Sequence, residues 1–202
     1  MGEKSIHEEK ISKAFSVARV FALISIVSAH IVFSTGTPNL IARFFDVIAS
    51  VGVICFMFIS GYYYNSDSFG GFFKMLKKKL LTIVLPWVFL GSIGFLYNRI
   101  LSGIGLDIIE YLKWIIGNGS FLYYLTILMI CFLVFYKTHD VVLIIFMCLN
   151  VVSLMLTASG LLDGVVAFLH ITHYLNVFNW FGVFALGMFV KNTLISKNCI
   201  IF

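Results

Sequence analysis

Long apolar runs, each bounded by polar or charged residues, dominate the pattern along the chain. Six of them are long enough, or nearly long enough, to cross the ~30 Å hydrocarbon core of a bilayer as helices. A helix satisfies its own backbone hydrogen bonds in lipid, so the pattern predicts an all-α, polytopic membrane bundle. The six predicted spans cover residues 16–34, 47–64, 80–100, 121–136, 141–158 and 177–195.

The composition agrees with a membrane protein and excludes an ordinary soluble domain. Of the 202 residues, 61% are hydrophobic and only 11% are charged, whereas an average soluble domain is about 25% charged. We interpret residues 1–202 as one integral-membrane domain whose partner is the lipid bilayer. The net charge of +5 does not indicate nucleic acid, because the basic residues lie in short clusters at the ends of apolar runs.

Those clusters orient the chain. With the N-terminus inside the cell, eleven basic residues lie on the cytoplasmic side, and only Arg43, Arg99 and Lys113 lie outside. Cytoplasmic segments of membrane proteins carry the excess of Lys and Arg, so the count predicts an N-in, C-in topology. The eleven are Lys4, Lys10, Lys13, Arg19, Lys74, Lys77, Lys78, Lys79, Lys137, Lys191 and Lys197.

Two segments between or within the spans have distinct local patterns. GIGLDIIEYLKWIIG carries Asp107, Glu110 and Lys113 at three-residue spacing among apolar residues, which predicts a short amphipathic helix on the outer surface with Trp114 at headgroup level. Pro86 lies inside the third span, where it removes a backbone N–H and should kink the helix.

The cysteines and histidines do not form a metal-ligand pattern. Cys55, Cys131 and Cys148 lie inside apolar runs, where they are expected to pack as small hydrophobic residues. His170 and His173 could share a metal in principle, but two ligands without a third make a weak site. We therefore predict no metal. In the inner loop, His139 and Asp140 read as solvated turn residues.

The first span contains two costly polar residues, Arg19 and His30, separated by ten residues. Eleven helical steps of about 100° end roughly 20° from where they began, so both residues share one face, about 16 Å apart along the axis. Arg19 is either a snorkelling anchor or a functional cation. His30 lies deeper and is expected to face a polar cavity or a partner helix, with a structural hydrogen bond to Ser25 or Ser28 as the alternative.

Two further groups have both structural and functional interpretations. Ser60 and Gly61 end the second span and form either a packing notch, with an aromatic belt made by the tyrosines 62–64, or part of a site. Lys77, Lys78 and Lys79 open the third span and could bind a phosphate or meet anionic lipid.

Five segments, in order along residues 19–190, resemble the acyltransferase-3 family of integral membrane acyltransferases. RVFALISIVSAH matches the family's Arg and His in the first span, and GVICFMFISGYY its Phe-rich second span. KKKLLTIVLPWVF is similar to the basic third span with its proline. FLYYLTILMICFL resembles the family's Trp-Phe-Leu-Tyr helix without the Trp, and FGVFALGMFV its Phe-Leu-x-Gly-Met segment.

The resemblance implies transfer of an acyl group, usually acetyl, from cytoplasmic acyl-CoA to a hydroxyl at the outer side. The expected acceptor is a surface polysaccharide or lipopolysaccharide precursor, and the expected location is a bacterial inner or plasma membrane. His30 would be the general base, with or without a covalent acyl intermediate. Arg19 would bind donor phosphate or stabilise negative charge. Ser60 would line the site, and Lys77, Lys78 and Lys79 would receive donor phosphate.

Three hypotheses follow from the number of spans. Members of the family usually have more than the six spans predicted here, so the chain resembles their N-terminal part and is expected to be truncated at its C-terminus. It is an O-acyltransferase, which in this short form could need a partner subunit or homo-oligomer, or a non-catalytic membrane subunit or decayed relative, or a small transporter in which Arg19 and His30 belong to a proton or solute path.

Overall fold

The computed structural model describes residues 2–34, 39–118, 122–168 and 173–200. These residues form helices without any strand, which confirms the predicted all-α class. The long helices are α1 (Gly2–Ser34), α2 (Asn39–Tyr63), α4 (Leu85–Ser102), α7 (Asp140–Ala158) and α9 (Phe178–Ile200). The shorter elements are η1 (Asp67–Phe69), α3 (Phe72–Lys79), η2 (Leu80–Val84), α5 (Ile108–Ile116), α6 (Tyr123–Val134), α8 (Asp163–Phe168) and η3 (His173–Leu175).

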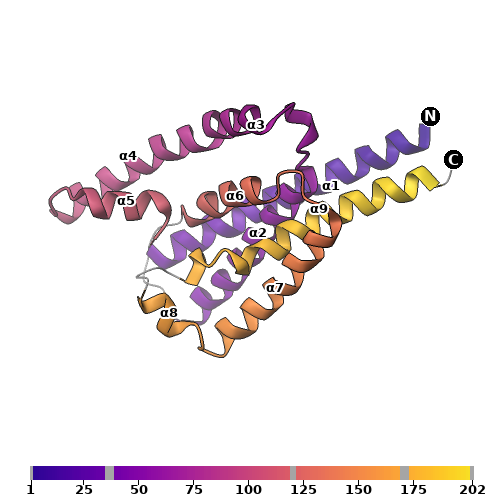
Figure 1. Cartoon of the computed structure of the whole chain (residues 1–202). Helices are drawn as coiled ribbons and strands as arrows, with labels where there is room; N and C mark the ends of the chain where they lie inside the picture. Colours follow the sequence, from indigo (N-terminus) through magenta and orange to yellow (C-terminus); the bar gives the residue numbers. More distant parts are fainter. Residues whose placement is uncertain (1, 35–38, 119–121, 169–172, 201–202) are drawn as a thin grey trace.

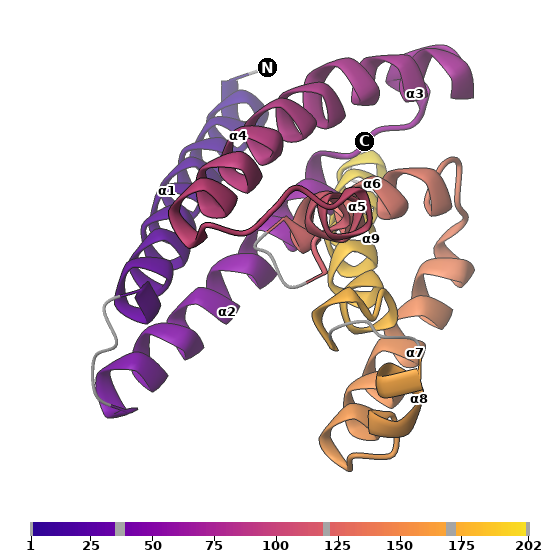
Figure 2. The same cartoon turned by 90° about the vertical axis from the view of Figure 1, so that its left-hand side faces the viewer.

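The long helices pack in the order α1, α2, α9, α7, each against the next. Figure 1 shows both chain termini at one end of this group, with α5 and α8 toward the other end. The segment α3–η2–α4 runs beside the group (Figure 2), and α5 folds back against α4 (Figure 1). The predicted cytoplasmic termini and the predicted outer helix thus lie at opposite ends of the bundle.

Three continuous helical segments of the described chain are long and apolar enough to cross a membrane: Glu9–Ser28, Phe72–Ser102 and Asp140–Ala158. Val47–Tyr63 and Tyr123–Val134 are apolar but shorter. These five segments overlap the first five predicted spans, and α9 overlaps the sixth. Membrane-spanning character is therefore confirmed, while the count of six spans and the N-in, C-in orientation stay predictions.

Pro86 changes the helix in a specific way. The turn before it, η2, is a π-helix in which the N–H of Leu85 bonds to the carbonyl of Leu80. Proline has no N–H to donate and its ring crowds the carbonyl four residues earlier, so a wider turn relieves this conflict. The helix continues on both sides of the π turn. The irregularity predicted at Pro86 is therefore a π turn just before the proline.

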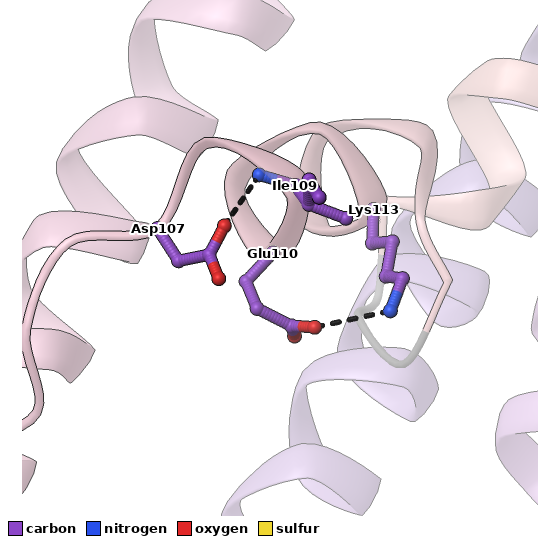
Figure 3. A network of polar contacts seen from close by, with 4 residues as sticks. All are labelled: Asp107, Ile109, Glu110 and Lys113. Carbon is purple, nitrogen blue, oxygen red and sulfur yellow. Dashed lines mark hydrogen bonds and ion pairs between the residues drawn. The ribbon is translucent and has the colours of Figure 1, made fainter.

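The amphipathic helix predicted at the outer surface is present as α5. Its N-cap is Asp107, whose carboxylate accepts a hydrogen bond of 2.7 Å from the N–H of Ile109. Lys113 forms a 3.0 Å ion pair with Glu110 (Figure 3). The indole N–H of Trp114 donates to the Gly91 carbonyl of α4 at 3.0 Å, so this residue fixes α5 to α4.

Glycines allow the central helices to approach closely. A Cβ added at Gly61 of α2 would overlap the backbone carbonyl of Phe184, and one added at Gly187 of α9 would overlap that of Phe58. The two glycines therefore form a reciprocal contact between α2 and α9. This confirms the packing notch predicted at Ser60 and Gly61.

Beside this crossing lies an aromatic core built from Tyr64, Phe132, Phe135 and Phe184. Tyr64 is only 4% exposed, and its hydroxyl donates to the Phe132 carbonyl at 2.9 Å. The prediction that the tyrosines 62–64 form an interfacial belt is therefore wrong for Tyr64. α2 ends at Tyr63, and the loop that follows carries Tyr64 into the core. The apolar pattern alone did not indicate this burial.

A buried polar network joins α7 to the start of α9. Asn150 donates to the Phe178 carbonyl at 2.7 Å, and the Ser153 hydroxyl donates to the side chain of Asn179 at 2.7 Å. Asn176 donates to Ser153 at 3.0 Å. Each side chain has a partner, so the network holds the two helices together without leaving an unsatisfied group in an apolar surrounding.

Candidate functional site

One stripe of α1 faces α2. The Phe15 ring lies 4.8 Å from that of Tyr62, Ala22 is buried, and a Cβ at Gly52 of α2 would lie 2.8 Å from the Ala22 carbonyl and 3.2 Å from Ile26. Arg19 belongs to this stripe, since residues three and four apart share a helix face. The face that carries Arg19 is thus turned toward a protein neighbour.

Arg19 contacts the end of α2. Its guanidinium carbon lies 4.9 Å from the centre of the Tyr63 ring, which is a cation–π geometry. The side chain is otherwise accessible, so the nitrogen donors of the fork can still reach an anion. The structure therefore supports a positioned cation more than a freely snorkelling anchor.

Ser60 lies one turn before Tyr63 and is linked to α6. The side chains of Ser60 and Tyr124 are hydrogen-bonded, and the Tyr124 hydroxyl also interacts electrostatically with Arg19. Three helices thus supply three polar side chains to one location: Arg19 from α1, Ser60 from α2 and Tyr124 from α6. We call these three residues and Tyr63 the Arg19 cluster.

His30 lies in α1, eleven residues after Arg19 and four after Ile26. Its side chain lies outside the described residues, so its predicted role stays a prediction. The same holds for the suggested metal pair, because His170 and the His173 side chain also lie outside them. Among the described residues, no three candidate ligands come together.

The lysine triplet forms a separate group at the end of α3. Lys77 and Lys78 are exposed, and Lys79 is half-buried. The Lys79 ammonium lies 3.6 Å from the centre of the Phe132 ring, and Lys78 lies 5.4 Å from that of Phe69. Both rings pack against Tyr64. The triplet therefore reaches the core beside Tyr64, while Arg19 contacts the neighbouring Tyr63.

Two functional candidates were missed in the sequence. Tyr124 belongs to the segment FLYYLTILMICFL, but nothing in its spacing indicated contact with Ser60, 64 positions earlier. His139 and Asp140 were read as solvated turn residues, yet Asp140 accepts a hydrogen bond of 2.7 Å from Asn192 of α9. Such pairings depend on how distant helices pack, which local periodicity does not contain.

Comparison with protein families decides the class. The family model described as an acyltransferase domain, that of acyltransferase-3, matches residues 12–194. The chain belongs to the acyltransferase-3 family. The matched region contains Arg19, His30, Ser60 and the lysine triplet, and it extends into α9. No curated protein and no solved structure matches the chain.

Membership supports a membrane acyltransferase in general terms. For the acyltransferase-3 chain, the Arg19 cluster is the part of the described structure where two of the predicted site residues, Arg19 and Ser60, share a neighbour, Tyr124. It combines a guanidinium with the hydroxyl groups of Ser60, Tyr63 and Tyr124, which can donate or accept. This set can bind an anion and orient a neutral carbonyl or hydroxyl.

Proposed function

We propose that this chain is a membrane O-acyltransferase that moves an acyl group, most simply acetyl, from cytoplasmic acyl-CoA to a hydroxyl of a polysaccharide or lipopolysaccharide precursor. The proposed location is a bacterial inner or plasma membrane. The observation that carries the proposal is the Arg19 cluster, in which a cation of α1 contacts Tyr63 and interacts electrostatically with Tyr124, the partner of Ser60. Family membership supplies the class of reaction.

The proposed reaction is one acyl substitution. The acceptor hydroxyl oxygen attacks the thioester carbonyl carbon while His30 takes the hydroxyl proton as general base. The C–S bond then breaks, the ester is released, and the thiolate takes the proton back to give free coenzyme A. No oxidant or metal takes part in this balance.

Arg19 has a role that suits its chemistry. A guanidinium holds its charge at all relevant pH values and matches the oxygens of a phosphate. At the Tyr63 ring it would bind the donor or stabilise the negative charge that develops on the thioester oxygen. Ser60 and Tyr124 would orient the thioester, and Lys77, Lys78 and Lys79 would attract the donor's phosphates to the cytoplasmic side.

The test is acetylation of surface glycan in cells that produce the chain. We expect base-labile acetyl groups on the glycan with the wild type and their loss with His30→Ala. Val27→Ala is the matched control, because Val27 lies one turn away on the exposed surface of α1. Equal acetylation by His30→Ala, at equal protein in the membrane, would contradict catalysis and favour a non-catalytic relative. Solute flux that persists without acyl-CoA would favour a transporter.

A further inference from the structure

A polar pocket lies where the segment that follows α2, the α6–α7 turn and the middle of α9 meet. Its volume is about 570 Å³, which is within the usual range for small-molecule sites. None of the residues assigned to the proposed reaction lines it. The side chains that give the pocket its chemistry are Tyr64, Asp67, Lys137, His139, Lys191 and Asn192.

Two lysines from distant parts of the chain supply positive charge. Lys137 is exposed in the α6–α7 turn, where its backbone is left-handed with φ of 53°. Lys191 is held in place because its ammonium donates to the Tyr64 carbonyl at 3.0 Å. An ammonium has three donors, so Lys191 can still bind a ligand oxygen. The pocket thus has one exposed cation, Lys137, and one cation held by a hydrogen bond, Lys191.

One acidic residue lines the pocket, and a second is bonded to a lining residue. Asp140, the first residue of α7, already accepts a hydrogen bond from Asn192. Asp67 lines the pocket and is exposed. A carboxylate repels a bare anion but accepts hydrogen bonds from hydroxyl and amino groups. The charges therefore suit a ligand that carries both phosphates and neutral donor groups.

We propose that this pocket binds the nucleotide part of the acyl donor, adenosine 3′,5′-bisphosphate as carried by coenzyme A. This rests on the proposed function and deepens it. Lys137 and Lys191 bind the phosphates, Asp67 accepts from a ribose hydroxyl or the adenine amino group, and the His139 ring is available for contact with the purine. Inorganic phosphate and an anionic lipid headgroup offer the phosphate without the purine.

The position of the pocket fits a donor that extends toward the Arg19 cluster. Tyr64 lines the pocket, the adjacent Tyr63 carries Arg19, and Ser60 lies one turn earlier on α2. A nucleotide held at Tyr64 would direct its thioester arm along this end of α2. The N-in topology that the lysine distribution predicts places the pocket at the cytoplasmic surface, where acyl-CoA is present.

The test is binding of radiolabelled adenosine 3′,5′-bisphosphate to the purified full chain in nanodiscs of neutral lipid. Lys137→Gly removes the cation at a backbone angle that glycine adopts freely, so folding is not impaired. We expect this variant and Lys191→Gln each to weaken binding about tenfold, as for the loss of one charge-assisted hydrogen bond. Lys113→Ala, a lysine of α5 away from the pocket, should bind like the wild type.

Competition separates the possible ligands. Unlabelled acetyl-CoA should displace the nucleotide, whereas inorganic phosphate at equal concentration should not. Displacement by nanodiscs that contain phosphatidylglycerol would assign the pocket to lipid and overturn the proposal. Absence of binding, or equal binding by the lysine variants and the wild type, would overturn it as well.

Kinetics distinguish this proposal from the proposed function. If acetyl transfer occurs and Lys137→Gly leaves the KM for acetyl-CoA unchanged, the pocket proposal fails and the proposed function stands. If the nucleotide binds through the two lysines while His30→Ala leaves surface acetylation unchanged, the proposed reaction fails and the nucleotide pocket stands.

Discussion

The guanidinium carbon of Arg19 lies 4.9 Å above the ring centre of Tyr63. This contact joins the first helix to the end of the second, beside the hydrogen bond between Ser60 and Tyr124. The ring holds a cation without consuming its hydrogen-bond donors, because the attraction acts through the face of the π system. Arg19 is therefore both positioned by the fold and available to a ligand.

Replacement at this contact should separate charge from geometry. Arg19→Lys keeps the charge but loses the planar fork, so we expect acyl transfer to fall about tenfold. Tyr63→Leu removes the cation–π contact together with the ring contacts of Tyr63 to Phe15 and Tyr62, and we expect a decrease of about two- to fivefold, matching roughly 0.5–1 kcal/mol for the cation–π contact. The measurement is kcat/KM for acetyl-CoA. A Lys variant as active as the wild type would contradict a role for bidentate binding.

The bond between Ser60 and Tyr124 should act as one unit. Ser60→Ala and Tyr124→Phe each remove one partner, and we expect each to reduce kcat/KM about three- to tenfold, as for the loss of one hydrogen bond. The double variant should lose little more than either single variant, because the interaction is already absent. Strictly additive losses would show that the two hydroxyl groups act independently. Ser68→Ala, an exposed serine in η1, is the control.

The crossing of α2 and α9 should tolerate no side chain at its centre. Gly61→Ala places a Cβ on the Phe184 carbonyl, and Gly187→Ala places one on that of Phe58. We expect each to destabilise the protein by about 1–3 kcal/mol, because backbone must move. Gly105→Ala is the matched control, since a Cβ there has open space. Tm in detergent, followed by tryptophan fluorescence, measures the effect. A Tm unchanged by Gly61→Ala would refute the close approach.

Much of the fold could be predicted because its cause is local. Apolar length places the helices to within a few residues at many boundaries, and three-residue spacing indicates α5 with its Asp107 cap. Pro86 marks an irregular turn because one proline is enough to remove one hydrogen bond. In contrast, α1 begins at Gly2, before its apolar run, because polar residues such as Glu9 and Lys13 also form helix and pair across one turn.

The rest depends on contacts between distant segments. The burial of Tyr64 and the pocket at Lys137 and Lys191 require α6, α7 and α9 to meet the end of α2. The partner of Ser60 is Tyr124, and that of Asp140 is Asn192. No periodicity records these pairings. A sequence indicates which polar residues are costly to place in an apolar segment, whereas the packing of distant helices decides which of them lie together.

The polar network between α7 and α9 should contribute to stability. Asn150→Leu deletes the donor to the Phe178 carbonyl, and we expect a loss of about 1 kcal/mol, typical of a hydrogen bond between membrane helices. Ser153→Ala should cost a similar amount, since its hydroxyl contacts both Asn176 and Asn179. Asn98→Ala is the control, because Asn98 lies on the exposed end of α4. Reversible unfolding in mixed micelles measures each difference. Variants as stable as the wild type would show that the network is energetically neutral.

The predicted orientation can be tested with single cysteines in a cysteine-free background. Lys113 lies on α5 at one end of the bundle, and His139 lies in the α6–α7 turn near the end that carries the termini; both are exposed. The excess of cytoplasmic lysines predicts that Lys113→Cys reacts with a membrane-impermeant maleimide added to intact cells. His139→Cys should react only after the membrane is opened. The reverse result would place the lysine triplet and the nucleotide pocket outside the cell, away from acyl-CoA, and would exclude both proposals for this chain.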